Sequence, residues 1–190
     1  QVVNANDGAI LAGFTADVEF DVVDNAAGLI AEMGGADVAG QLTEANSITV
    51  DDGQGGQVVN ANDGAILAGF TADVAFDVTD NANAVAAEVT GSNGAGDLDE
   101  VNTLIVSGGD VDTSQAGAIQ SISGYDDVAS NYEITDNAAA VIGAGNSVIE
   151  NDGVTRVEVT NDATALEGVS LNNYSANVDF DVSDTAEAIA

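Results

Sequence analysis

A long internal repeat is the feature of this sequence that most constrains its fold. Residues 1–25 return as residues 57–81 with 23 of 25 positions identical, so that Gln57 corresponds to Gln1. The signal Asp-Asn-Ala or Asp-Thr-Ala recurs in the same frame, at Asp24, Asp80, Asp136 and Asp184. Repetition at a fixed period is typical of proteins that stack one supersecondary unit on the next. We therefore divide the chain into units of about 1–56, 57–112 and 113–160 with a partial unit 161–190, all within one repeat domain.

Each unit contains short segments in which apolar and polar residues alternate. Seven such segments end on an apolar residue: Val22, Val50, Val78, Val106, Ile134, Val159 and Val182. A second apolar residue stands two positions earlier, at Phe20, Ile48, Phe76, Leu104, Tyr132, Val157 and Phe180. Alternation with period two predicts a strand that buries one face. We expect both sets inside, with the aromatic residues forming an interior stack.

Helical patterns follow several of these strands. After Asp24, the apolar residues Ala26, Leu29, Ile30 and Met33 fall at helical spacing, and two glycines then end the run. Residues 81–89 and 136–142 show the same pattern, and the Asp, Asn or Thr before each run is a predicted N-cap. The alternate connections, such as residues 51–56, are rich in Asp and Gly and are predicted to be turns.

Strands joined by crossovers of this length run parallel. The sequence therefore predicts an α/β solenoid of about seven coils of 23–28 residues, with one stacked parallel β-sheet and a second wall of short Ala-rich helices. The alternative is a parallel β-helix, in which the Ala-rich stretches form further strands. Alanine favours helix over strand, which supports the α/β version.

The charge excludes several classes of function. The chain has 33 Asp and Glu residues, a single Lys or Arg, no His and no Cys, for a net charge of −32. That balance opposes nucleic-acid binding, and no apolar run is long enough for membrane insertion. Without His or Lys to activate a nucleophile, we expect no enzyme, and a carbohydrate-active enzyme using paired carboxylates is a remote alternative. The apolar fraction of 45% nevertheless predicts a folded chain.

Two columns of carboxylates are the candidate metal ligands. One follows the strand ends by two residues and contains Asp24, Asp52, Asp80, Asp136 and Asp184. The other lies on the outer strand face and contains Asp21, Asp77, Glu133, Glu158 and Asp181, of which the three aspartates are the candidate ligands. Stacked like charges repel, and calcium prefers such oxygen ligands, so calcium is the predicted cofactor. The alternative is that these residues cap helices or form Asx turns.

Residues 180–189 (FDVSDTAEAI) and 132–141 (YEITDNAAAV) carry a resemblance to a known class of repeats. They resemble the degenerate V-x-D-T-A-x-x-I repeats of very large secreted bacterial surface proteins, of the hemolysin-type or adhesin-like kind. The resemblance implies an extracellular or cell-surface location, a structural or adhesive role, and often calcium dependence. The glycine-rich calcium motif G-G-x-G-x-D is absent, so that motif assigns no ligands here.

These observations lead to one functional prediction and one alternative. We expect an extracellular structural repeat protein that forms a filament, a surface layer or a matrix element by end-to-end stacking of coils, stabilised by divalent cations. Its expected partner is a second copy of itself, with other surface proteins or polysaccharide as further partners. Neither end of the sequence resembles a polar cap, which favours stacking. The alternative is a spacer or adhesion segment of a giant secreted adhesin.

Overall fold

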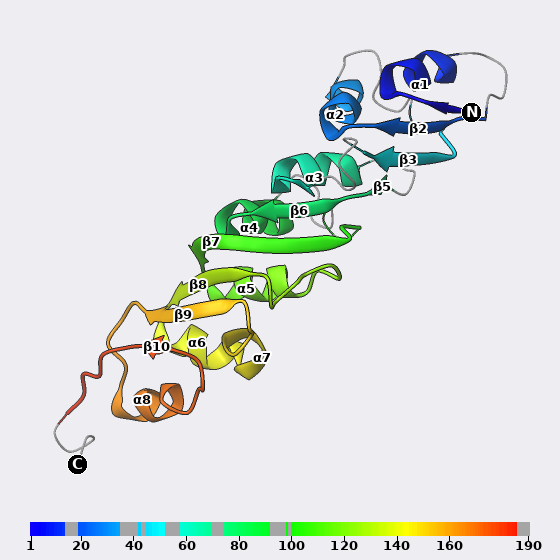
Figure 1. Ribbon diagram of the computed structural model, residues 1–190. Helices are drawn as coiled ribbons and strands as arrows, with labels where there is room; N and C mark the ends of the chain where they lie inside the picture. The colour runs from blue at the N-terminus through cyan, green and yellow to red at the C-terminus, as the bar shows by residue number, and fades with distance from the viewer. Residues whose placement is uncertain are drawn as a thin grey trace.

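The computed structural model describes residues 1–13, 19–34, 42, 45–51, 58–69, 74–91, 98 and 100–185. Within them, strands and helices succeed one another along an elongated molecule, and the described chain runs from one end of it to the other (Figure 1). The strands are β1 (Val2–Val3), β2 (Asp21–Asp24), β3 (Ser47–Val50), β4 (Val58–Val59), β5 (Val74–Ala75), β6 (Asp77–Asp80), β7 (Thr103–Val111), β8 (Asn131–Asp136), β9 (Val154–Val159) and β10 (Val178–Asp179). The helices are α1 (Ala5–Ala12), α2 (Ala26–Gly34), α3 (Ala61–Ala68), α4 (Ala82–Thr90), α5 (Thr113–Gln120), α6 (Ala138–Ala144), α7 (Asn146–Ile149) and α8 (Ala165–Leu171).

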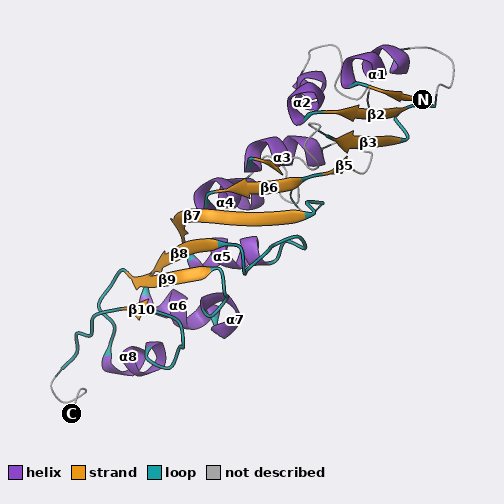
Figure 2. Ribbon diagram, in the orientation of Figure 1, coloured by secondary structure: helices purple, strands orange, loops and turns teal. Residues whose placement is uncertain are grey.

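The strands form two parallel sheets. One contains β1, β2, β3 and β5 in that order, and the other contains β10, β9, β8, β7, β6 and β4. Successive helices also contact one another, from α1 through α6 and then α8, so a row of helices accompanies the strands (Figure 2). The protein is therefore an α/β protein with repeated β–α units.

The prediction of a single sheet is wrong, and the strand register gives the reason. Val22 pairs with Ile48, and Ile48 pairs with Val74. The sequence spacing had instead aligned Val22 with Val50 and Val78. Each observed partner lies two positions before the aligned one, so after two pairings the partner is Val74, four positions before Val78. The segment that contains both residues is divided into β5 and β6, which lie in different sheets. β5 pairs back with β3, Phe76 follows it, and β6 pairs with β4 and β7.

The core lies between the strands and the helices. The apolar residues two positions before each strand end were predicted to be buried. The first six of these seven are at most 2% exposed: Phe20, Ile48, Phe76, Leu104, Tyr132 and Val157. These assignments are confirmed. Phe180, the seventh, is only partly buried. The small residues Ala61, Ala82 and Ala138 are fully buried on the helices, which lets the helices approach the strands closely.

The three predicted helices are confirmed at α2, α4 and α6. Asn81 and Asn137 cap α4 and α6 by accepting the backbone amide three residues later. The sequence reasoning missed α5, α7 and α8, and also α1 and α3, which begin in the motif Asn-Ala-Asn-Asp-Gly. Asn4 and Asn60 cap these helices in the same way. Within the described residues, no helix is long and apolar enough to cross a lipid bilayer.

Candidate functional site

The Asp of each Asp-Asn-Ala signal connects one β–α unit to the unit before it. Asp24 lies at the end of β2, and its Oδ2 accepts the backbone amide of Ala5, the first residue of α1, at 3.0 Å. Asp80 does the same for Ala61 of α3 at 3.1 Å. The other carboxylate oxygen accepts the amide of the Asn that follows the Asp, at 2.8 Å and 2.7 Å respectively. Each Asp therefore satisfies a helix amide that would otherwise lack a partner.

The same bridge recurs toward the C-terminal end. Oδ2 of Asp136 accepts both the backbone amide and the hydroxyl of Thr113, at 3.2 Å and 2.7 Å. Asp184 accepts the amide of Ala165 at 3.0 Å. Asn161 takes the place of the Asp once, and its Oδ1 accepts the amide of Ala138 at 2.8 Å. An uncharged oxygen therefore suffices for the bridge.

These contacts lower the pKa of two of the bridging carboxylates. Partial burial works to raise the pKa of Asp136, but the hydrogen bonds from Thr113 and Asn137 outweigh it and hold the pKa below its usual range. The amides of Ala165 and Thr185 lower the pKa of Asp184. Both side chains are therefore held as carboxylates by backbone and hydroxyl donors.

The predicted metal ligands have the following positions. Asp24, Asp80, Asp136 and Asp184 form the bridges just described, and Asp21 accepts the hydroxyl of Ser47 at 2.8 Å. Asp77 lies in β6, Asp181 follows β10 and is exposed, and Asp52 lies outside the described residues. Within the described chain, no three acidic side chains are grouped so that they could hold a metal ion. Calcium binding stays a prediction.

The predicted continuous columns are wrong, because the register is shifted by two residues. Asp24 pairs with Val50, and Asp21 pairs with Ser47. Glu133 pairs with Arg156, while Glu158 pairs with Thr135. Asp24 and Asp21 therefore lie beside an apolar and a hydroxyl residue. Glu133 and Glu158 keep an acidic neighbour on their other side, Asp110 and Asp179 respectively, and Arg156 lies among these acids.

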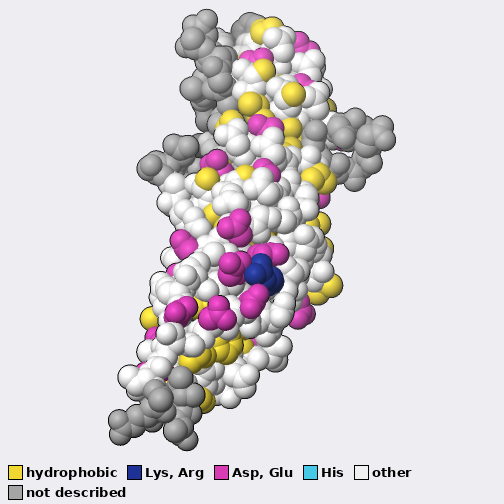
Figure 3. All heavy atoms as spheres, turned by 90° about the vertical axis from the view of Figure 1, so that its left-hand side faces the viewer, with side chains coloured by type: hydrophobic (Ala, Val, Ile, Leu, Met, Phe, Trp, Pro, Cys, Tyr) yellow, Lys and Arg dark blue, Asp and Glu magenta, His cyan; other side chains and the backbone are white. Residues whose placement is uncertain are grey.

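Arg156, the only basic side chain of the sequence, is surrounded by carboxylates. Its guanidinium lies 3.1 Å from Glu133, 3.0 Å from Glu158 and 3.3 Å from Asp179, on three adjacent strands. Figure 3 shows this one basic patch among acidic side chains. The hydrogen bonds that the guanidinium donates to Asp179 and Glu133 raise the pKa of Arg156. The group ties β8, β9 and β10 together at the surface, where solvent screens each ion pair and keeps its contribution to stability small.

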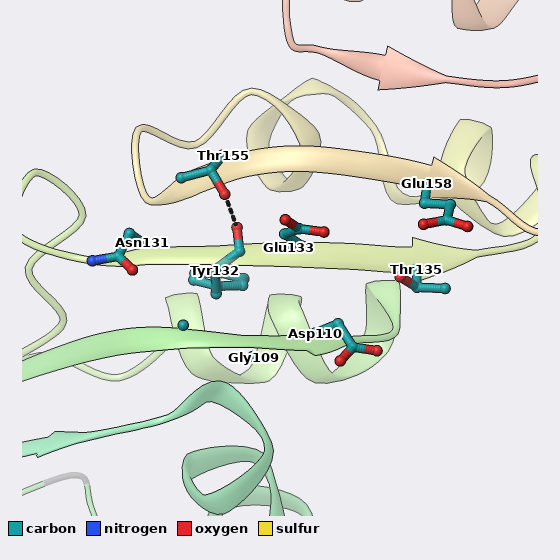
Figure 4. A pocket seen from close by; sticks show the side chains of 9 residues that line it. Gly109, Asp110, Asn131, Tyr132, Glu133, Thr135, Thr155 and Glu158 are labelled. Atoms are coloured by element: carbon teal, nitrogen blue, oxygen red, sulfur yellow. Dashed lines mark hydrogen bonds between the residues drawn. The ribbon is translucent and has the colours of Figure 1, made fainter.

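A polar depression of about 550 Å³ lies next to this cluster, over β7, β8 and β9. Asp110, Glu133 and Glu158 contribute carboxylates to its lining, and Thr155 donates its hydroxyl to the carbonyl of Tyr132 at its edge (Figure 4). β7 bulges here, where Gly108 and Gly109 have φ values of 75° and 88°. Only glycine adopts such angles readily, so the bulge depends on this pair.

The C-terminal end of the described chain repeats the geometry of the N-terminal unit. Ala163 pairs with Val182, as Val3 pairs with Val22. Side chains that are buried within the stack are exposed at this end: Val182 is 44% exposed, against 0% for Val22 and Val78. Leu166 and Val169 of α8 are 79% and 63% exposed. Together with Phe180 they line a groove of about 700 Å³.

The N-terminal end exposes the opposite side of the same unit. Ile10 of α1 is 58% exposed and Leu11 is partly exposed, whereas Leu67, the equivalent of Leu11 in α3, is fully buried. α3 packs between α2 and α4, whereas the main helix contact of α1 within the described chain is with α2. Each end therefore presents an apolar surface that its internal counterpart buries.

Comparisons of this chain with protein-family models, with curated proteins and with solved structures find no match.

Proposed function

We propose that this chain is an extracellular structural repeat protein, an α/β solenoid that stacks end to end into a filament, a surface layer or a matrix element. A second copy is its partner, and the assembly is heterologous, since the N-terminal face of one copy meets the C-terminal face of the next. Such an assembly extends without closing. Among the described strands, β1 and β10 form sheet edges at the two ends, and backbone pairing along these edges would add main-chain hydrogen bonds to the contact.

One observation carries this proposal. Apolar side chains at both ends are exposed or partly exposed, while the equivalent positions in the internal copies are buried. Val182 and Val78, and Leu11 and Leu67, are two such pairs. Apolar surface removed from water contributes about 25 cal/mol per Å². The net charge of −32 opposes association, so screening salt is expected to promote it.

Light scattering at increasing protein concentration in high salt tests the proposal. We expect the mass of the wild-type particles to grow with concentration. The exposed end residues Ile10 and Leu166 are each replaced by Asp, and both variants should scatter as monomers. Val128, which is 80% exposed away from both ends, provides the matched control, since Val128→Asp adds the same charge. A wild-type chain that stays monomeric at every concentration contradicts the proposal.

Divalent cations are part of the proposal, and the large negative charge supports them. If calcium binds the predicted aspartates, chelation lowers the melting temperature, and calcium restores it where sodium at equal ionic strength does not. Equal rescue by sodium leaves charge screening as the whole effect.

The alternative function is a spacer or adhesion segment of a giant secreted adhesin. The same exposed end faces favour it, because further coils of one polypeptide would cover them as α2 covers α3. Here the isolated chain would bind its neighbours weakly or not at all. A longer protein that contains several such units would then form a continuous rod in electron micrographs while remaining monomeric.

A further inference from the structure

The groove at the C-terminal end has two counterparts inside the molecule. Each is built around a glycine in the first turns of a helix: Gly8 in α1, Gly64 in α3 and Gly168 in α8. A methyl group placed on these glycines would lie 2.9 Å from Val22, 2.7 Å from Val78 and 2.9 Å from Val182, respectively. A phenylalanine ring is a further close neighbour in all three. The three surfaces therefore have the same construction.

The two internal surfaces are filled by a leucine that comes later in the same repeat unit. Leu42 lies 3.2 Å from the methyl position of Gly8, and Leu98 lies 3.2 Å from that of Gly64. Both leucines are 2% exposed. At Gly168 the neighbours are Val182 and Phe180, and no described residue takes the place of the leucine. Within the described chain, the groove is therefore a third leucine site that holds no leucine.

A backbone hydrogen bond next to the leucine is likewise made in the internal copies and missing from the described residues at the C-terminal groove. In the internal copies, the amide of Asn46 donates to the carbonyl of Phe20 at 2.8 Å, and the amide of Asn102 donates to that of Phe76 at 2.9 Å. The part of the chain that the structure describes offers no amide to the equivalent carbonyl of Phe180. An incoming segment would therefore gain a main-chain hydrogen bond as well as an apolar pocket.

The segments that fill the internal sites share a sequence. Residues 42–48 read LTEANSI and residues 98–104 read LDEVNTL, which gives the pattern Leu-x-Glu-(Ala/Val)-Asn-(Ser/Thr)-(Ile/Leu). In both, the leucine enters the site, the Asn amide reaches the Phe carbonyl, and the last residue joins the buried strand face.

We propose that the groove formed by Gly168, Phe180 and Val182 is a docking site for a segment of this pattern, presented by another repeat molecule. The leucine enters between Val169 and Phe180, and the segment continues as a strand beside residues 178–182. This is β-augmentation with one side-chain anchor, since main-chain bonds give affinity and the pocket gives specificity. The inference rests on the proposed stacking, because it names the contact that would extend or cap the C-terminal end.

A peptide of residues 94–107 of this chain, labelled with a fluorophore, tests the proposal by anisotropy against the intact protein. We expect saturable binding, and at least about tenfold weaker binding for the same peptide with Leu98→Ser, because the buried leucine side chain supplies most of the apolar contact. On the protein, Val169→Asp should abolish binding. Val128→Asp, at a valine outside the groove that is more exposed than Val169, should leave it unchanged.

The outcomes separate this inference from the proposed function. No binding of the peptide, or equal binding of the Leu98→Ser peptide or of the Val169→Asp protein, overturns the docking site whether or not the chain polymerises. Binding that follows the expected pattern supports the site even if light scattering shows only monomers. Where the wild-type chain does assemble, excess peptide should shorten the particles and the Leu98→Ser peptide should not.

Discussion

The carboxylate of Asp24 accepts the backbone amide of Ala5 across 19 residues, so the end of one strand holds the start of the preceding helix. Every later copy of the Asp-Asn-Ala or Asp-Thr-Ala signal repeats this contact. The conspicuous acidic residue of the repeat is therefore explained by an unsatisfied helix amide. This contact accounts for the position of the aspartates without a metal ion.

Substitution of Asp80 separates this role from that of a charged ligand. Asp80→Asn should change the free energy of unfolding by less than about 0.5 kcal/mol, because Asn161 makes the same bridge with an amide oxygen. Asp80→Ala removes the acceptor for Ala61 and Asn81 and should cost about 1–2 kcal/mol. Urea denaturation measures both. Equal losses in the two variants would show that the negative charge itself is needed.

Acid should unfold the protein through the same carboxylates. The folded-state pKa values of Asp136 and Asp184 lie below their usual range, so these groups stabilise the fold fully above the unfolded pKa of about 3.9. That contribution is lost as the pH falls below about 4, through the folded-state values. Circular dichroism against pH should therefore show unfolding in this range, with an Asp136→Asn variant less sensitive to acid. An identical acid transition in that variant would contradict the role of Asp136.

Much of the core was predictable because the alternation of apolar and polar residues recurs in each repeat. Six residues are buried as that pattern indicates: Phe20, Ile48, Phe76, Leu104, Tyr132 and Val157. The register was not predictable, since sequence spacing measures the length of the loop as well as the strand, and a loop can lengthen without moving the paired residues. The pairing of Val22 with Ile48 instead of Val50 is such a case. That shift determined which acidic side chains became neighbours.

Helices α1 and α3 were missed because their first residues are poor helix formers. Asn-Ala-Asn-Asp-Gly is a turn sequence by propensity, but Asn4 and Asn60 act as N-caps, and Gly8 and Gly64 are required where the strand packs against the helix. Tertiary packing therefore overrides local preference there. The leucine sites could have been found from the sequence, because Leu42 follows Val22 at the same spacing at which Leu98 follows Val78.

The position of a phenylalanine in the stack should determine the cost of removing it. Phe76 is 2% exposed and lies where the two sheets meet, so Phe76→Ala should cost about 3–5 kcal/mol of unfolding free energy. Phe180 occupies the equivalent place at the open end and is partly exposed, so Phe180→Ala should cost about 1–2 kcal/mol. Thermal and urea unfolding of the two variants measure the difference. Equal costs would mean that the open end is covered in solution.

Glycines at two helix positions should respond oppositely to alanine. A methyl group on Gly64 would lie 2.7 Å from Val78 and 3.1 Å from Phe76, closer than packed carbon atoms approach, so Gly64→Ala should destabilise the fold by about 1–3 kcal/mol. On Gly117 of α5 the nearest atom is Val148 at 3.9 Å, so Gly117→Ala meets no obstacle. There it should stabilise the helix by about 0.5–1 kcal/mol, because alanine loses less backbone entropy on folding. Urea denaturation of both variants gives the sign of each effect, and a neutral or stabilising Gly64→Ala would remove the basis for the leucine sites. Binding of the 94–107 peptide to Gly117→Ala should equal binding to the wild type, since α5 lies away from the C-terminal groove.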